Sequence, residues 1–453
     1  MANATALGDL LSTLLDRKLF PRRGGREGHL PDLCRKLLAE TSEASGLQLA
    51  ASILETYRQL PAEGRIAFYR FLNDDLDIDA NEVARLASIY AEDPCPENFR
   101  NLSRASEPKR QDLFRRLNQA PGATAELVAM RADLLSQLAH APELGRTDHD
   151  LVHLLRSWFN RGFLVLRQIT WDTPASILER IIAYEAVHEI HTWDDLRRRL
   201  QPADRRCFAF FHPAMPDDPL IFVEVALTDG VPGSIQGVLS DNRTALPEEA
   251  VNTAVFYSIS NCQAGLAGIS FGNSLIKQVV RDLSRDLPGL KKFVTLSPIP
   301  GLSRWLAAEG LEAAQNDPTQ LRRMAALYLL DAKKKDGRPL DPVARFHLAN
   351  GATVHQIHSE ADVSDKGIAL SGGAMVNYLY DLSKIAQNSE AFGQKNEIAA
   401  TTALRALARQ AAKNRNAISG RPKVHRETDR PSPDVPDAGW DEEAAPPAAQ
   451  DAS

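Results

Sequence analysis

The segment that decides the fold is TAVFYSISNCQAGLAGISFGNSLIKQVVRDLSRDL, residues 253–287. Its first eight residues are rich in β-branched and aromatic side chains and predict a buried strand. Residues 273–287 place apolar side chains at helical spacing, which predicts an amphipathic helix. Between them lies a glycine-rich loop, 263–273, whose backbone N–H groups and helix start favour an anion such as a pyrophosphate. A tight turn that binds nothing is the alternative.

The elements around this segment indicate the fold class. Strands are predicted at 162–171, 206–212, 219–227 and 291–297, and short helices at 175–187 and 193–200. Helices that connect strands in this order predict an α+β or α/β fold with one mixed sheet.

The chain divides into three parts by its pattern. Residues 1–160 show apolar side chains at helical spacing, so we expect an all-helical domain with an interaction or oligomerisation role. Residues 161–413 form the second domain. Residues 414–453 carry almost no large apolar side chains and are predicted to be disordered.

The composition excludes several classes of protein. A net charge of −6 over 453 residues argues against a nucleic-acid binder. The four cysteines show neither CxxC nor zinc spacing, so we expect free thiols. The sequence has no run of about 18 apolar residues and no signal-peptide core in its first twenty residues, which favours a cytoplasmic protein without a membrane span. His188 and His191 miss the spacing of an HExxH zinc motif, so we expect no metal site.

Two polar residues stand in apolar surroundings. Ser297 begins the sequence SPIPG, directly after a strand-like run. Proline fixes φ and pushes the preceding residue into an extended conformation, so a stiff turn presents this hydroxyl at the mouth of a strand. His347 lies between Phe346 and Leu348, just before an Asn-Gly turn signal. The alternation predicts that His347 points away from its apolar neighbours at a strand end, where sites are often assembled. A histidine that only packs in the core is the alternative.

The glycine-rich loop supports a second interpretation. It contains Gly268-Ile-Ser270-Phe-Gly272, which fits the nucleophile-elbow pattern of serine hydrolases. In that case Ser270 is the nucleophile and His347 is its base. The strand–turn–helix context fits a hydrolase as well, so this function stays open.

Five stretches together resemble the malonyl-CoA decarboxylase family. They are FHPAMPDDPLIFVEVAL (211–227), VFYSISNCQAGLAGISFGNSLIK (255–277), LSPIPGLSRWL (296–306), PVARFHLANGA (342–352) and MVNYLYDL (375–382). The resemblance implies a helical oligomerisation domain followed by a catalytic domain of the GNAT acetyltransferase fold. It also implies conversion of malonyl-CoA to acetyl-CoA and CO2 without a metal or organic cofactor, by a homotetramer built as a dimer of dimers.

The resemblance further assigns site residues. The family's catalytic serine in SPIPG corresponds to Ser297, and its catalytic histidine in FHL-NGA corresponds to His347. Both also contact the substrate. Its CoA-binding loop corresponds to Ala267, Gly268, Ile269, Ser270, Phe271, Gly272 and Asn273, and in this case Ser270 need not be a nucleophile. A GNAT-type acyl-CoA acyltransferase would share the loop and fold but require an amine acceptor, and it is the other alternative.

The chemistry of the implied reaction agrees with these residue types. Loss of CO2 from a malonyl thioester leaves electrons on the thioester oxygen as an enolate. The site must stabilise that oxygen and then deliver a proton to carbon. We therefore expect Ser297 to meet the malonyl carboxylate and His347 to supply the proton.

Overall fold

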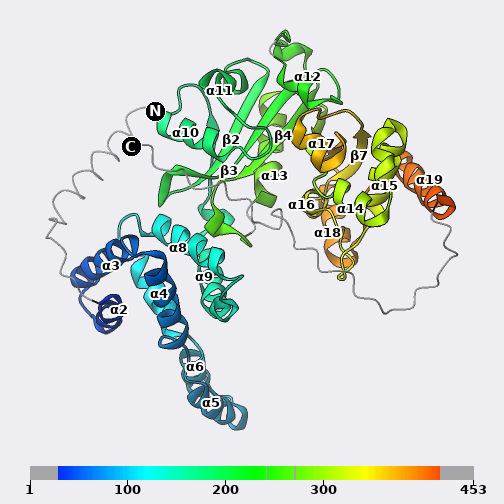
Figure 1. Ribbon diagram of the computed structural model, residues 1–453. Coiled ribbons are helices and arrows are strands. Elements are labelled where there is room, and N and C mark those ends of the chain that lie inside the picture. The colour runs from blue at the N-terminus through cyan, green and yellow to red at the C-terminus, as the bar shows by residue number, and fades with distance from the viewer. Residues whose placement is uncertain (1–28, 241, 270–271, 419–453) are drawn as a thin grey trace. The chain divides into compact units, whose positions relative to one another are not determined.

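The computed structural model describes residues 29–240, 242–269 and 272–418 (Figure 1). The chain divides into two compact units between Trp158 and Phe159. Each unit is described by itself below.

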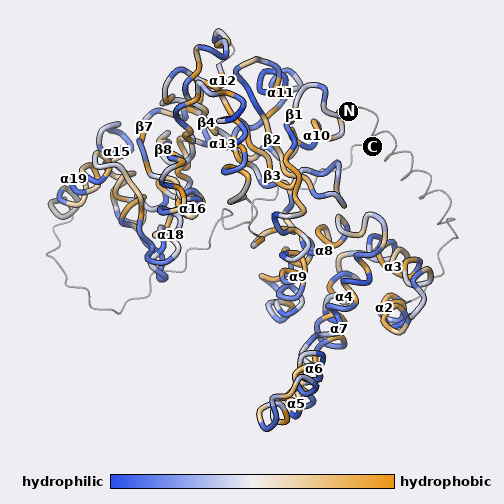
Figure 2. The backbone as a smooth tube through the Cα atoms, turned by 180° about the vertical axis from the view of Figure 1, so that it is seen from behind, coloured by the Kyte–Doolittle hydropathy of each residue, from blue (hydrophilic) through white to orange (hydrophobic). Residues whose placement is uncertain are grey.

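Every regular element in residues 29–158 is a helix, as the periodicity predicts. The elements are α2 (Leu30–Ala39), α3 (Glu43–Arg58), α4 (Ala62–Asp74), α5 (Ala80–Glu92), α6 (Pro96–Ala105), α7 (Lys109–Leu117), α8 (Ala123–Gln137), the 3-10 turn η1 (Pro142–Leu144) and α9 (Gly145–Trp158). Hydrophobic and hydrophilic residues alternate along these helices in Figure 2, as expected for helices with one buried face.

The core of the first unit contains paired polar groups. The Tyr57 hydroxyl hydrogen-bonds to the Tyr69 hydroxyl, and Tyr69 donates to the Met130 carbonyl at 2.8 Å. The buried Arg110 guanidinium pairs with Asp150 and, at 3.0 Å, with Asp77. These contacts connect segments that are distant in sequence. Removing one partner would leave a buried charge unsatisfied, so the pairs help to hold the helices together.

The second unit is built on one mixed sheet. Its strands are β1 (Val165–Ile169), β2 (Arg205–His212), β3 (Met215–Thr228), β4 (Thr253–Asn261), β5 (Lys292–Thr295), β6 (Ser297–Pro298), β7 (Thr353–His358) and β8 (Met375–Leu379). They lie in the order β1-β2-β3-β4-β5-β8-β6, and β7 also pairs with β8. The pairs from β1 to β4 are antiparallel, whereas β4 and β5 are parallel. A parallel pair needs a crossover connection, and here helix α13, within residues 253–287, connects β4 to β5.

The remaining elements surround this sheet. They are η2 (Arg161–Phe163), α10 (Ala175–Tyr184), α11 (Trp193–Leu200), α12 (Ile235–Leu239), η3 (Glu248–Ala250), η4 (Ala264–Leu266), α13 (Gly272–Asp286), α14 (Leu302–Glu309), η5 (Glu312–Asn316), α15 (Pro318–Asp331), α16 (Pro342–Ala349), α17 (Asp365–Ser371), α18 (Ile385–Lys395) and α19 (Thr402–Ile418). Ile177 and Ile181 of α10 and Leu196 of α11 share a buried cluster with Cys207 and Phe211 of β2. Helices α10 and α11 therefore cover one face of the sheet.

The predicted fold class is confirmed: a helical N-terminal domain precedes a domain with a mixed sheet. Two details differ from expectation. Helix α10 ends at Tyr184 rather than at 187, because the Glu185 carboxylate accepts the backbone N–H groups of Val187 and His188 in place of helical bonds. Helix α19 continues to residue 418, past the predicted end of the domain at 413. Residues 419–453 of the predicted tail lie outside the described residues.

All four cysteines are free, as expected. Among the residues that the structure describes, no helix is both long and apolar enough to cross a lipid bilayer.

Candidate active site

Ser297 lies two residues after Thr295, the last residue of β5 that pairs with β4. Strand β5 ends at Thr295, and β6 then pairs Ser297 with Val376 of β8. The SPIPG turn leads directly into α14, and its Gly301 is packed tightly, since a Cβ there would meet the Tyr328 hydroxyl at 2.1 Å. The serine side chain is buried, with 6% exposed. The prediction of a hydroxyl held at the mouth of a strand by a stiff turn is confirmed.

His347 lies on helix α16, and the predicted strand end is wrong. The segment begins with Asp341-Pro342, in which the Asp341 carboxylate accepts the Ala344 N–H at 2.8 Å and caps the helix. Proline in the first turn and a capping aspartate are a helix-start signal, and it overrides the apolar alternation around the histidine. His347 lies in the last turn of this helix with 2% of its surface exposed.

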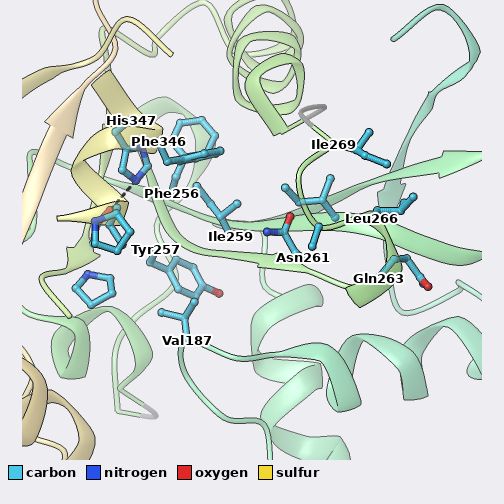
Figure 3. Close-up of a pocket in the computed structure, with 16 residues that line it drawn as sticks. Val187, Phe256, Tyr257, Ile259, Asn261, Gln263, Leu266, Ile269, Phe346 and His347 are labelled. Atoms are coloured by element: carbon cyan, nitrogen blue, oxygen red, sulfur yellow. Dashed lines mark hydrogen bonds between the residues drawn. The ribbon is translucent and has the colours of Figure 1, made fainter. Parts of the chain in front are cut away.

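The two predicted residues meet in the structure. The His347 Nε2 atom lies 3.1 Å from Ser297 Oγ, in a hydrogen bond marked by the dashed line in Figure 3. Ser297 Oγ donates to Thr295 Oγ1 at 2.8 Å. On the other side of the ring, His347 Nδ1 lies 2.8 Å from the Tyr380 hydroxyl. These four side chains form one continuous hydrogen-bonded line.

The directions of these bonds assign the protons. Because Ser297 donates to Thr295, its lone pairs face His347, whose Nε2 must then carry a proton. Nδ1 is left as an acceptor for the Tyr380 hydroxyl. Burial lowers the pKa of His347 to about 3, so the imidazole is neutral at neutral pH. The site thus holds an uncharged histidine with its proton directed toward Ser297.

The Tyr378 ring fixes the plane of this imidazole. Tyr378 stacks on His347 with ring centroids 4.5 Å apart and an interplanar angle of 24°. Its own hydroxyl is buried and has no hydrogen-bond partner among the described residues, and its backbone N–H donates to Thr295 Oγ1 at 3.1 Å. Asn377, the preceding residue, donates to the Thr295 carbonyl at 2.7 Å. Residues of strand β8 therefore contact both Thr295 and His347 in this hydrogen-bonded line.

A pocket of about 140 Å³ extends from this pair along β4 to the glycine-rich loop. Figure 3 shows His347 and Phe346 at one end and Leu266, Gln263 and Ile269 at the other. The lining residues are mostly apolar: Val187, Ile221, Phe256, Tyr257, Ile259, Asn261, Gln263, Leu266, Ala267, Ile269, Ser297, Pro298, Pro342, Val343, Phe346 and His347. Ser297 and His347 lie at one end of this pocket, and the glycine-rich loop lies at the other.

The structure places part of the predicted loop at this pocket. Ala267 and Ile269 line it, and Gly268 adopts a φ of +79°, a conformation that favours glycine. Gly272 and Asn273 begin α13. Ser270 and Phe271 lie outside the described residues, so the hydrolase interpretation of Ser270 is not tested here. The predicted base of that hydrolase, His347, is hydrogen-bonded to Ser297.

Sequence reasoning missed three members of the site: Thr295, Tyr378 and Tyr380. The sequence signal that could have found them is their spacing of two residues. Thr295 precedes Ser297 by two residues, and Tyr378 precedes Tyr380 by two, and in extended chain residues at this spacing point to the same side. In the described part of the chain, no group of three or more His, Cys, Asp or Glu residues could hold a metal ion.

An apolar pocket that ends in a buried hydroxyl–imidazole pair defines an α+β protein suited to proton transfer on a small organic molecule. Comparison with known proteins narrows this class. The model of the malonyl-CoA decarboxylase C-terminal domain matches residues 162–321 and 308–418, and that of the N-terminal domain matches 76–159. The chain belongs to the malonyl-CoA decarboxylase family, as the resemblance implied.

Individual relatives agree with this assignment. The mitochondrial malonyl-CoA decarboxylase of the goose Anser anser anser is 37% identical over 336 residues, which is 63% of this chain and 66% of the goose protein. The rat protein of the same name is 36% identical over 65% of this chain and 70% of its own length. The chain thus spans about two thirds of the curated relatives it matches.

Solved structures cover more of the chain. The malonyl-CoA decarboxylase of Agrobacterium vitis is 48% identical with a TM-score of 0.80 and covers 84% of this chain and 99% of that one. The structure from Rhodopseudomonas palustris is 47% identical with a TM-score of 0.79, covering 83% and 98%. At this identity the similarity extends beyond the fold to the sequence itself.

Proposed function

We propose that this chain is a carboxy-lyase that converts malonyl-CoA to acetyl-CoA and CO2, using Ser297 and His347. The observation that carries the proposal is the buried hydrogen bond between Ser297 and His347 at one end of an apolar pocket. Family membership and relatives named as malonyl-CoA decarboxylases support the choice of substrate.

The pocket suggests how the substrate binds. The pantetheine arm of CoA is long and thin and would lie along the apolar wall formed by Ile259 and Leu266. Its phosphates would then reach the loop 267–273 and the start of α13, where backbone N–H groups can receive an anion. The malonyl group would reach the other end, with its carboxylate at Ser297.

The carbon–carbon bond would break at this apolar end. A carboxylate loses its hydration shell beside Pro298, Phe256 and Phe346, and CO2 carries no charge, so the apolar wall favours its release. The electron pair of the broken bond moves into the thioester as an enolate. The hydrogen bond from the protonated His347 Nε2 can stabilise the developing negative charge, and Ser297 can donate to it once its hydroxyl turns away from Thr295.

His347 would then deliver the proton to carbon. Its pKa is low in the free protein because burial disfavours the imidazolium. A substrate carboxylate beside the ring favours the charged form and raises this pKa. With malonyl-CoA bound, His347 takes up one proton from solvent at Nδ1. Transfer of the Nε2 proton to the enolate carbon then completes acetyl-CoA and leaves a neutral imidazole whose Nδ1 proton faces the Tyr380 oxygen.

One experiment separates this function from the alternatives. The purified protein is incubated with malonyl-CoA alone, and the products are identified. We expect acetyl-CoA and CO2 in equal amounts. Free CoA with malonate would instead indicate a hydrolase that uses Ser270, and no reaction until an amine is added would indicate a GNAT-type acyltransferase.

Two further expectations remain predictions. The first is a homotetramer built as a dimer of dimers, in which the helical unit mediates assembly. The second is a cytoplasmic location, whereas the goose and rat relatives are named as mitochondrial proteins.

A further inference from the structure

A second cavity of about 140 Å³ lies beside the candidate active site. Two residues, Val187 and Pro298, line both this cavity and the substrate pocket. Pro298 directly follows Ser297, where the proposed reaction releases CO2. The lining of the second cavity also includes Ala374 and Met375 from the core and Lys366 and Leu370 from α17. We call this cavity the side chamber.

The side chamber extends from the core to the surface. Its inner residues Ala374 and Met375 are completely buried. Its outer residues lie on α17, where Leu370 is half-buried and Lys366 is exposed. A molecule that entered at Pro298 could therefore leave at α17 without passing along the substrate pocket.

The ionisable side chains that line the side chamber either form hydrogen bonds with the protein or are uncharged. The Lys366 ammonium donates to the Ala186 carbonyl at 2.6 Å, and Asp362 Oδ1 accepts from Gln236 and Ser364. Burial lowers the pKa of His188 to about 4, so this side chain is uncharged at neutral pH. The rest of the lining is mainly apolar, which suits a small uncharged molecule better than an anion such as bicarbonate.

Hydrogen bonds fix the segment around Val187, which lines both cavities. This segment follows α10, and the buried Glu185 carboxylate accepts the N–H groups of Val187 and His188 at 2.9 and 2.8 Å. Ser258 of β4 donates to the same carboxylate, and the Arg199 guanidinium donates to the His188 carbonyl at 2.8 Å. Val187 therefore keeps a fixed position beside the point where the two cavities adjoin.

We propose that the side chamber receives CO2 and conducts it to solvent at α17, an inference that rests on the proposed decarboxylation. While the thioester arm fills the substrate pocket, CO2 that stays beside the enolate can recombine with its carbon and re-form the broken bond. A separate void with room for several water-sized molecules removes CO2 from that carbon before the proton is delivered.

The test uses a plug and a matched control on the same helix. Leu370→Trp fills the outer end of the side chamber, whereas Ile368→Trp adds the same ring at an exposed position that does not line it. For each variant, kcat and the ¹³C isotope effect at the malonyl carboxyl carbon are measured. Wild type must first release CO2 from malonyl-CoA, so failure of the proposed function is recognised before the variants are compared.

We expect Leu370→Trp to lower kcat by about five- to tenfold, because product escape then limits turnover. Its isotope effect should fall toward unity, since recombination makes the bond cleavage reversible. Ile368→Trp should match wild type in both measurements. An unchanged kcat in Leu370→Trp, or a lower kcat with the wild-type isotope effect, would overturn the proposal.

A second measurement does not depend on a variant. Crystals of the wild-type protein held under CO2 pressure should show the gas in the side chamber next to Pro298. CO2 density elsewhere in the protein, with this chamber empty of it, would contradict the proposal.

Discussion

His347 is kept neutral and oriented by the residues around it. Its ring is buried, stacked on Tyr378 and hydrogen-bonded through both nitrogens. Each contact has a separate effect: burial lowers the pKa, the stack fixes the ring plane, and the hydrogen bonds choose the tautomer. The two tyrosines can be distinguished experimentally because only the Tyr380 hydroxyl contacts the ring nitrogen.

Tyr380→Phe should therefore lower kcat, by about ten- to a hundredfold, because His347 loses the partner that fixes its tautomer. Tyr378→Phe is the matched control. In the described part of the chain the Tyr378 hydroxyl has no hydrogen-bond partner, so its removal keeps the stacking and should leave kcat nearly unchanged. Steady-state kinetics of both variants test this. Equal losses in the two would mean that the Tyr380 hydrogen bond has no special role.

The low pKa of His347 also affects stability at acidic pH. In the unfolded chain a histidine binds a proton near pH ~6.5, whereas folded His347 does so only at about 3. Between these values the unfolded state binds more protons, so the protein loses stability as the pH falls, by up to ~1.4 kcal/mol per pH unit from this one residue.

His347→Asn should therefore reduce the dependence of stability on pH. Calorimetry across the range from about pH 7 to 5 should show a smaller fall in Tm for this variant than for wild type. His140→Asn, at an exposed position in the helical unit, is the control and should keep the wild-type dependence. A steeper fall in His347→Asn would show that the buried imidazole is charged.

At the scale of elements, a short helix and a stiff turn hold His347 and Ser297. Helix α16 carries His347 and is capped by Asp341, which is completely buried. Burial raises the pKa of this carboxyl group to about 6. One of its neighbours is Tyr328, whose hydroxyl also packs against Gly301 of the SPIPG turn. Asp341 thus lies where the element that carries His347 meets the turn that follows Ser297.

Asp341→Ala should lower both stability and activity. Loss of a helix cap costs about 0.5–2 kcal/mol, and displacement of α16 would misplace His347 and reduce kcat. Asp341→Asn keeps an oxygen that can accept the Ala344 N–H, so it should retain more of both. Thermal unfolding and kcat are measured for each variant. Equal activity of Asp341→Ala and wild type would separate this cap from the site.

The elements also show how far the sequence could predict the molecule. Within 253–287 the strand and the helix form as expected, because local patterns of apolar residues specify them. His347 was placed on the wrong element, since three alternating residues carry less information than the Asp-Pro start signal before them. Thr295, Tyr378 and Tyr380 were missed because their role depends on the pairing of β8 with β5 and β6, which connects residues about 80 positions apart.

At the scale of the whole molecule, helices α5 and α6 expose apolar side chains in the part of the chain that the structure describes. Helices α5 and α6 contain no buried residue, although Tyr90 and Phe99 pack against each other with ring centroids 5.9 Å apart. Phe99 is 56% exposed. Exposed apolar groups of this kind are typical of surfaces that bind another chain, and the predicted oligomer supplies a second copy.

Phe99→Asp should therefore shift the protein toward a smaller species. Asn101→Asp places the same charge on the same helix without removing an apolar group and serves as the control. Light scattering at micromolar concentration gives the masses. We expect a tetramer for wild type and for the control, and a monomeric wild type would contradict the predicted assembly.

The central claim is that Ser297 and His347 act together on one step. The direct test is kcat for Ser297→Ala, His347→Asn and the double variant with malonyl-CoA as substrate. Ser303→Ala is the control, because its hydroxyl has no hydrogen-bond partner among the residues that the structure describes. We expect His347→Asn to lower kcat by about 10²–10⁴-fold, Ser297→Ala to lower it somewhat less, and the double variant to lose little more than His347→Asn alone. Ser303→Ala should remain active. A fully active Ser297→Ala beside an inactive Ser270→Ala would contradict the account and establish the hydrolase instead.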